Sequence, residues 1–178
     1  KIAQIMQKAF NAEQQARIFP KFAKDPRGIL ASGNTEPGIG SDKFTSHPVP
    51  FRTSAVKTQG GWIVNGLKQF ISNGNRAGYY LVRVQTDKAK TMADGSTMFL
   101  VERDRPGFTI GRVHDKMGER LANNAELVFQ DCFIPDENVV GLVDKGAKER
   151  AEFMAASNAY AGASVLGVAV ALHNKAIE

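Results

Sequence analysis

The sequence predicts an α+β protein in which a β-rich domain lies between helical segments. Apolar residues recur at nearly helical spacing from residue 1 to about residue 20. Short runs rich in β-branched and aromatic residues, bounded by turn residues, follow from Ile29 to about Leu142. A proline-free stretch rich in small and apolar residues then runs from about Lys145 to Glu178. Several short strands at this spacing favour a β-barrel or sandwich over alternating β and α units.

Composition places the chain among globular proteins. It has 178 residues, of which 43% are hydrophobic and 23% charged, enough for one domain with its own core. No apolar run approaches the ~18 residues of a membrane span, so no membrane insertion is expected. The net charge of +5 is dispersed among acids, which argues against nucleic-acid binding. The single Cys132 excludes an intrachain disulfide and fits a reducing compartment, and we interpret it as a buried apolar side chain.

The first predicted helix has two candidate interruptions. Asn11 can divide it in two, and Pro20 is expected to end it or to start a second short piece. Asp25 to Gly28 is predicted to turn, because proline pre-sets φ at the second position and glycine closes the turn. The helical spacing is carried by Ile2, Ile5, Met6, Phe10, Ala16 and Phe19.

The β-rich region divides into short predicted strands. A hairpin is expected around Gly60-Gly61, because β-rich runs flank this pair. The segment from Tyr79 to Gln85 alternates as a half-buried strand does. The remaining runs are 54–58, 62–66, 68–72 (ending at the turn Asn73-Gly74), 98–101 and 125–129.

The last segment predicts a helix that packs among other helices. It is apolar and rich in small residues, and Gly162 and Gly167 each cost a helix about 1 kcal/mol against alanine, which close packing can offset. The pattern stops at Glu178 without a capping residue, and the chain starts at Lys1. We therefore expect the chain to be part of a longer protein.

Two segments are candidates for ligand binding. Residues 34–42 combine Pro37, two glycines and several hydrogen-bonding side chains, which favours a tight loop whose backbone N–H groups and hydroxyls can face a polar ligand. Residues 66–74 place Phe70, an aliphatic residue and Ser72 just before an Asn-Gly turn, where the ring can lie on a planar ligand. An ordinary surface turn and a strand end with a buried aromatic are the alternatives.

Several kinds of site are not supported by any motif. There is no dinucleotide-binding GxGxxG, no P-loop, and no CxxC or HExxH spacing, so no metal is expected. The histidines are far apart, and we interpret His47, His114 and His173 as surface or structural residues. The acids Glu36, Asp42 and Asp115 have no partner in any local pattern, so no general acid/base pair is predicted.

The two candidate segments, taken in order, resemble the acyl-CoA dehydrogenase family. Residues 35–42 are similar to its TEPGxGSD motif, and residues 62–74 to its INGxKxWITNG motif. Further resemblances are FLVE with Pro106-Gly107, the KMG segment at Lys116, and the segment from Phe129 to Gly141. These collinear motifs, together with a similar lead-in at residues 13–20, cover nearly the whole chain.

The resemblance implies three parts and a flavin site. Residues 1–28 would end an N-terminal helical domain, residues 29–143 would form a middle β-barrel domain, and residues 144–178 would begin a C-terminal four-helix bundle. FAD would lie between barrel and bundle. The residues implied to bind the cofactor are Ser32, Asn34, Thr35, Ser41, Phe70, Ile71 and Ser72, and those implied to face the substrate are Ser41 and Asn158.

The chain also departs from the family pattern. Phe70 stands where the family usually has Trp, Ser72 stands for Thr, and extra residues lie around residues 45–50. Asn158 occupies the position of a substrate-facing arginine, and Ser157 the position where some members carry the catalytic glutamate. No catalytic residue is therefore assigned, and the base is expected beyond Glu178, so residues 1–178 alone should be inactive.

The function implied is an FAD-dependent oxidoreductase that dehydrogenates the Cα–Cβ bond of an acyl-CoA thioester. The implied partners are acyl-CoA, an electron-transfer flavoprotein or similar acceptor, and further copies of the protein in a homotetramer, in the cytoplasm or the mitochondrial matrix. The alternatives are a non-catalytic paralogue, which Asn158 favours, and a flavin-dependent monooxygenase or oxidase of the same fold.

Overall fold

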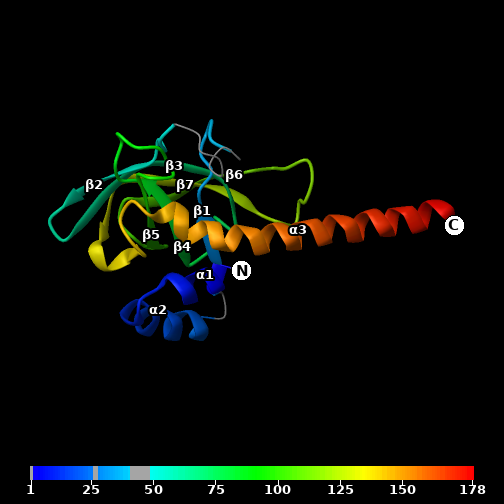
Figure 1. Cartoon of the computed structure of the whole chain (residues 1–178), viewed down its shortest axis with the longest axis horizontal. Helices are drawn as coiled ribbons and strands as arrows, with labels where there is room; N and C mark the ends of the chain where they lie inside the picture. Colours follow the sequence, from blue (N-terminus) through cyan, green and yellow to red (C-terminus); the bar gives the residue numbers. More distant parts are fainter. Residues whose placement is uncertain (1, 26–27, 41–48) are drawn as a thin grey trace.

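The computed structural model describes residues 2–25, 28–40 and 49–178. A β-domain forms the body, two short helices pack against one side of it, and a long helix extends away from it (Figure 1). The helices are α1 (Ile2–Ala9), α2 (Ala12–Lys24) and α3 (Gly146–Ile177). The strands are β1 (Leu30–Gly33), β2 (Ser54–Thr58), β3 (Gly61–Ser72), β4 (Tyr79–Gln85), β5 (Ser96–Glu102), β6 (Phe108–Val113), β7 (Asn124–Pro135) and β8 (Val139–Val140), with a 3₁₀ turn at Asp136–Asn138.

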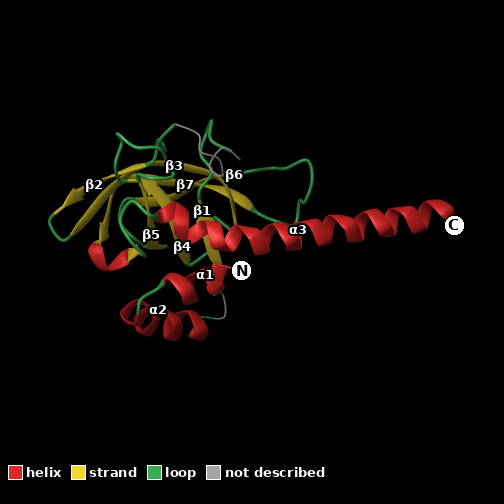
Figure 2. Cartoon of the chain, in the orientation of Figure 1, coloured by secondary structure: helices red, strands yellow, loops and turns green. Residues whose placement is uncertain are grey.

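The eight strands form one mixed sheet, which Figure 2 shows wrapped into the body of the molecule. Its order is β6-β7-β3-β2-β4-β5-β8, with β1 pairing with β4 in parallel. The sheet is curled, as shown by aromatic side chains that are in contact although their strands are not neighbours in this order. Tyr80 on β4 contacts Phe108 on β6 with ring centroids 4.8 Å apart, and Trp62 on β3 contacts Phe99 on β5 at 5.7 Å. The predicted α+β fold, with a β-domain between helices, is confirmed.

Two apolar clusters stabilise this arrangement. The larger lies inside the curled sheet and includes Val64, Tyr80, Phe99 and Leu127. The second joins α1 and α2 to the sheet through the buried residues Met6, Phe10, Ile18, Leu30, Leu81, Met98, Leu100 and Val140. The two helices therefore cover the side of the sheet formed by β1, β4 and β5.

The N-terminal helical segment divides at Asn11, one of the two predicted interruptions. Asn11 caps α2, because its side chain accepts a hydrogen bond from the Gln14 N–H (2.8 Å) while the Gln14 side chain accepts from the Asn11 N–H (3.1 Å). The expectation that Pro20 ends the helix is wrong. Proline removes only one intrahelical hydrogen bond, and α2 continues to Lys24 because its cap and the burial of Ile18 offset that loss.

The strands extend beyond the predicted runs. The hairpin around Gly60-Gly61 is confirmed, with β2 and β3 antiparallel. The two runs at 62–66 and 68–72 form one 12-residue strand, β3, which pairs along its length with β7. β1, β6 and β8 were not predicted, because they are short or contain glycine and serine, and they become strands by pairing with longer neighbours.

Helix α3 confirms the predicted C-terminal helix. Its first residues lie against β5 and α1, and from residue 161 onward every side chain is exposed in this chain (Figure 1). For residues 161–178, the described part of the chain therefore does not provide the expected burial among other helices. Among the helices described, none has the length and hydropathy needed to cross a membrane.

Candidate functional site

The two predicted ligand-binding segments meet in the fold. The Gln69 N–H donates a hydrogen bond to the Thr35 carbonyl (2.8 Å), so the loop after β1 is joined directly to β3 one residue before Phe70. Thr35 is half-buried, and the next residue forms a two-way backbone bridge with Ile39 (3.1 and 3.0 Å), which closes a tight turn around Pro37 and Gly38. The two segments therefore lie side by side and form adjoining walls of the candidate ligand site.

Glu36 is buried behind this loop and is ion-paired with a residue 32 positions away along the chain. Its carboxylate lies 2.6 Å from the Lys68 ammonium, and both side chains have no exposed surface. Asp115 forms an exposed ion pair with Arg120 at 2.8 Å. Neither ion pair is a pair of acid and base groups of the kind that the sequence analysis sought, and Asp42 lies outside the described residues.

Phe70 projects from β3 because the strand is irregular there. The register of β3 against β7 shifts between Lys68 and Ile71, and Phe70 has φ of 56°, a left-handed value that bulky residues rarely adopt. The ring is 53% exposed, although its neighbour Ile71 is buried in the core at 2%. The bulge therefore directs an aromatic face out of the sheet, and only the backbone of Ile71 remains for a ligand.

His114 lies against Phe70, a contact that the sequence analysis did not predict. Its ring centroid lies 4.3 Å from that of Phe70, and its Nε2 is buried without a hydrogen-bond partner. Asn124 on β7 completes this corner, because its Nδ2 donates to the Phe70 carbonyl (3.0 Å) and to the Ser72 hydroxyl (3.2 Å). No local motif could have indicated His114, since β6 brings it to Phe70 through the sheet.

Ser32 and Asn34 lie at the end of β1. The Asn34 amide donates to the Ser32 hydroxyl (2.9 Å), while the Asn34 Oδ1 is buried and without a partner. This buried acceptor without a donor precedes Thr35, which is bonded to the residue before Phe70, and it fits a planar ligand that carries ring N–H groups. The residues present therefore fit a flavin.

Two of the predicted site residues, Ser41 and Asn158, cannot be placed in the site. Ser41 lies outside the described residues, as does His47. Asn158 and Ser157 lie within α3, but their side chains are likewise outside the part of the chain that the structure describes. The remaining six cofactor-binding residues lie on β1, on the loop after it and on the end of β3: Ser32, Asn34, Thr35, Phe70, Ile71 and Ser72.

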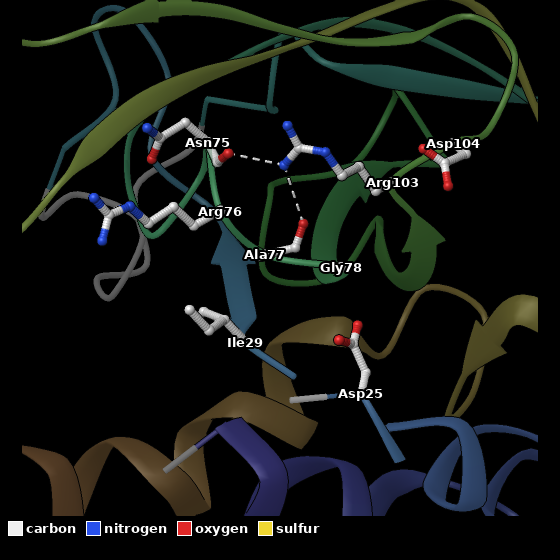
Figure 3. Close-up of a pocket in the computed structure, with 8 residues that line it drawn as sticks. All are labelled: Asp25, Ile29, Asn75, Arg76, Ala77, Gly78, Arg103 and Asp104. Carbon is white, nitrogen blue, oxygen red and sulfur yellow. Dashed lines mark hydrogen bonds between the residues drawn. The ribbon is translucent and has the colours of Figure 1, made fainter. Parts of the chain in front are cut away.

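A cleft of about 550 Å³ lies beside the turn that follows Ser72 and contains none of the predicted residues. In Figure 3, Arg103 reaches across it to the carbonyls of Asn75 (2.9 Å) and Ala77 (3.3 Å), and Asp25 points into it from the end of α2. The buried Tyr80 hydroxyl lies 2.8 Å from both the Gly74 and the Ala77 carbonyl and shares its one hydrogen between them, and burial raises the pKa of Tyr80. Hydrogen bonds from Arg103 and Tyr80 therefore stabilise the turn at residues 74–77.

Cys132 and metal binding give no further candidate site. Cys132 is fully buried, and burial raises the pKa of its thiol from 9.0 to about 11, so it is not a nucleophile near neutral pH. The interpretation of Cys132 as a structural residue is confirmed. Within the described ranges, no three His, Cys, Asp or Glu residues are placed to hold a metal ion.

Comparisons with known proteins define the class to which this site belongs. The family model "Acyl-CoA dehydrogenase, middle domain" matches residues 31–132. The chain therefore belongs to the acyl-CoA dehydrogenase family. It is 39% identical over 170 residues to the short-chain specific acyl-CoA dehydrogenase of Megasphaera elsdenii, covering 95% of this chain and 43% of that protein.

Solved structures show the same fold. An acyl-CoA dehydrogenase from Geobacillus kaustophilus superimposes with a TM-score of 0.75 at 38% identity, over 85% of this chain and 38% of that one. A glutaryl-CoA dehydrogenase from Mycobacterium smegmatis, solved in complex with FADH2, does so with a TM-score of 0.66 at 32% identity, over 82% of this chain and 35% of that one. The chain thus spans about two-fifths of the length of the relatives it matches.

Proposed function

We propose that the chain is the middle portion of a flavoprotein oxidoreductase that dehydrogenates an acyl-CoA thioester between Cα and Cβ by hydride transfer to FAD. The observation that carries this proposal is the hydrogen bond from Gln69 to Thr35, because it joins the two segments that resemble the family's flavin-binding motifs. The relative from M. smegmatis, which was solved in complex with FADH2, supports the same cofactor.

Residues of this chain bind and orient the isoalloxazine in this proposal. The Phe70 ring supplies an exposed aromatic face, while Asn34, Thr35 and Ser72 supply hydrogen bonds to the polar edges, with Ser32 holding Asn34 in place. When bound, FAD supplies the two-electron acceptor that the reaction needs. Ser41 is proposed to contact the cofactor or the CoA part of the substrate, and Asn158 to face the acyl chain.

The base that removes the α-proton is proposed to lie outside residues 1–178. Glu36 is the carboxylate next to Thr35, but it is buried and accepts hydrogen bonds from Lys68 and two backbone N–H groups, so it is not free to accept a proton. The reaction requires removal of that proton, and residues 1–178 alone are therefore expected to be inactive.

The whole protein is proposed to act as a homotetramer in the cytoplasm or the mitochondrial matrix. Its reduced flavin would pass electrons to an electron-transfer flavoprotein or a similar acceptor. These proposals follow from family membership.

The experiment is to express the full-length protein, record its flavin absorbance, and add a panel of acyl-CoA thioesters without oxygen. We expect bound FAD that one class of thioester bleaches. Protein without flavin would contradict the proposal. Bound flavin that no thioester bleaches would instead support a non-catalytic paralogue or a flavin-dependent oxidase. The variant Lys57→Met, far along β2 from the site residues, is the control and should bleach as the wild type does.

A further inference from the structure

The buried carboxylate of Glu36 is held by donors from two distant segments. Its Oε1 accepts from the Thr53 N–H (3.0 Å) and from the Lys68 Nζ (2.6 Å), and its Oε2 accepts from the Arg52 N–H (2.7 Å). The three bonds satisfy a charge that has no contact with water, which makes the pair costly to break from one side only.

The Lys68 ammonium also lies against an aromatic ring and has no exposed surface. It lies 3.9 Å from the centroid of the Phe51 ring, which contributes a cation–π contact in a site without solvent. Thr53 is held close to β3 as well, because its hydroxyl donates to the Leu67 carbonyl (3.1 Å). This approach requires Gly66, where a Cβ would lie 2.5 Å from the Thr53 Cα.

The ion pair and the backbone bond act on neighbouring residues of the same two segments. Thr35 is bonded to Gln69 through the backbone, and Glu36 is bonded to Lys68 through side chains. Two attachments one residue apart fix orientation as well as distance, whereas a single hydrogen bond permits rotation about it. Phe70 directly follows this double attachment.

We propose that the Glu36–Lys68 ion pair is a positioning device that fixes Thr35 relative to Phe70 and thereby sets the geometry of the ligand site. The inference rests on the proposed function for its consequence, flavin binding. Neither residue contacts the ligand in this proposal, since both side chains have no exposed surface. They act through the two walls that they hold together.

The test uses the full-length protein and four variants: Glu36→Gln, Lys68→Met, the double variant that carries both substitutions, and Lys57→Met. Each single variant at the buried pair removes one of the two opposite charges that the ion pair brings together, and should lose thermal stability. The double variant removes both charges, so its melting temperature should recover above those of the single variants. Lys57→Met removes an exposed ion pair with Asp136 (2.6 Å) and is the matched control.

Two readouts separate positioning from stability. The dissociation constant for FAD should rise about tenfold or more in the double variant despite its recovered melting temperature, and the flavin absorbance bands should shift. The exchange rate of the Gln69 amide, measured without FAD, should rise about tenfold over that of Lys57→Met because its acceptor is no longer held in place.

The outcomes distinguish the two proposals. If the wild type binds FAD and the double variant binds it as tightly with unchanged Gln69 exchange, the positioning role is wrong and the proposed function stands. If the wild type binds no FAD, the proposed function fails, and the Gln69 exchange rate alone decides whether the ion pair positions the two walls.

Discussion

Burial of individual residues determines which side chains of this chain a ligand can reach. Glu36 and Lys68 are fully buried and ion-paired with one another, and Cys132 is also fully buried. The groups that remain accessible, Phe70 and Ser72, lie at the end of one strand.

Cys132 gives a pH-dependent prediction at this scale. The folded pKa of about 11 lies above the ordinary value of 9.0, so the protonated thiol favours the folded state. This contribution is complete below pH 9 and is lost as the pH rises from 9 to 11. The free energy of unfolding should therefore fall more steeply over that interval in the wild type than in Cys132→Ala, as measured by urea unfolding. Parallel pH profiles would contradict the burial argument.

The bulge in β3 is the decisive feature at the scale of secondary-structure elements. Regular alternation would place neighbouring side chains on opposite faces along the whole strand. The register shift after Lys68 and the left-handed φ of Phe70 break that alternation, so that Phe70 points outward while Ile71 keeps its place in the core. Bulges are common beside ligand sites because they redirect single side chains in this way.

The variant Phe70→Ala tests whether the aromatic ring that the bulge exposes contributes to FAD binding. The ring is 53% exposed, so its removal should cost less than about 1 kcal/mol of unfolding free energy. The same change should weaken FAD binding by about tenfold, because it removes the aromatic face. Fluorescence titration of the full-length protein measures the second effect. Val56→Ala, at an exposed position of β2, is the control and should leave FAD affinity unchanged.

At the scale of the whole molecule, the second half of α3 is a large apolar surface. Its exposed residues include Val165, Leu166, Val168, Val170, Leu172 and Ile177, with exposures of 50–71%. Exposed apolar surface of this extent is typical of an interface. It continues into a groove of about 400 Å³ between the helix and Glu119.

We predict that the 178-residue chain self-associates through this surface. Sedimentation velocity should show association that rises with concentration, and the double variant Leu166→Lys with Val170→Lys should reduce it. The melting temperature of the β-domain should change by only a few degrees, because these side chains are exposed. Lys175→Ala should leave association unchanged. A wild-type chain that stays monomeric at high concentration would contradict the prediction.

Local patterns in the sequence were sufficient to predict much of the fold. The hairpin at Gly60-Gly61, the strand from Tyr79 to Gln85 and the C-terminal helix are each set by spacing and turn residues within a few positions. Pro20 was misjudged because the stability of α2 comes from its cap and its packing on the sheet. β6 was missed because its partner β7 lies further along the chain.

The sequence by itself determined that a β-domain lies between helical segments, and it identified the two segments that carry the candidate site. Only the tertiary structure decided that Thr35 bonds to Gln69, that Glu36 pairs with Lys68 across 32 positions, and that His114 lies against Phe70. The reason is physical. Periodicity and turn chemistry act over a few residues, whereas ion pairs, bulges and orphaned polar atoms depend on sheet register and burial, which the whole chain sets together.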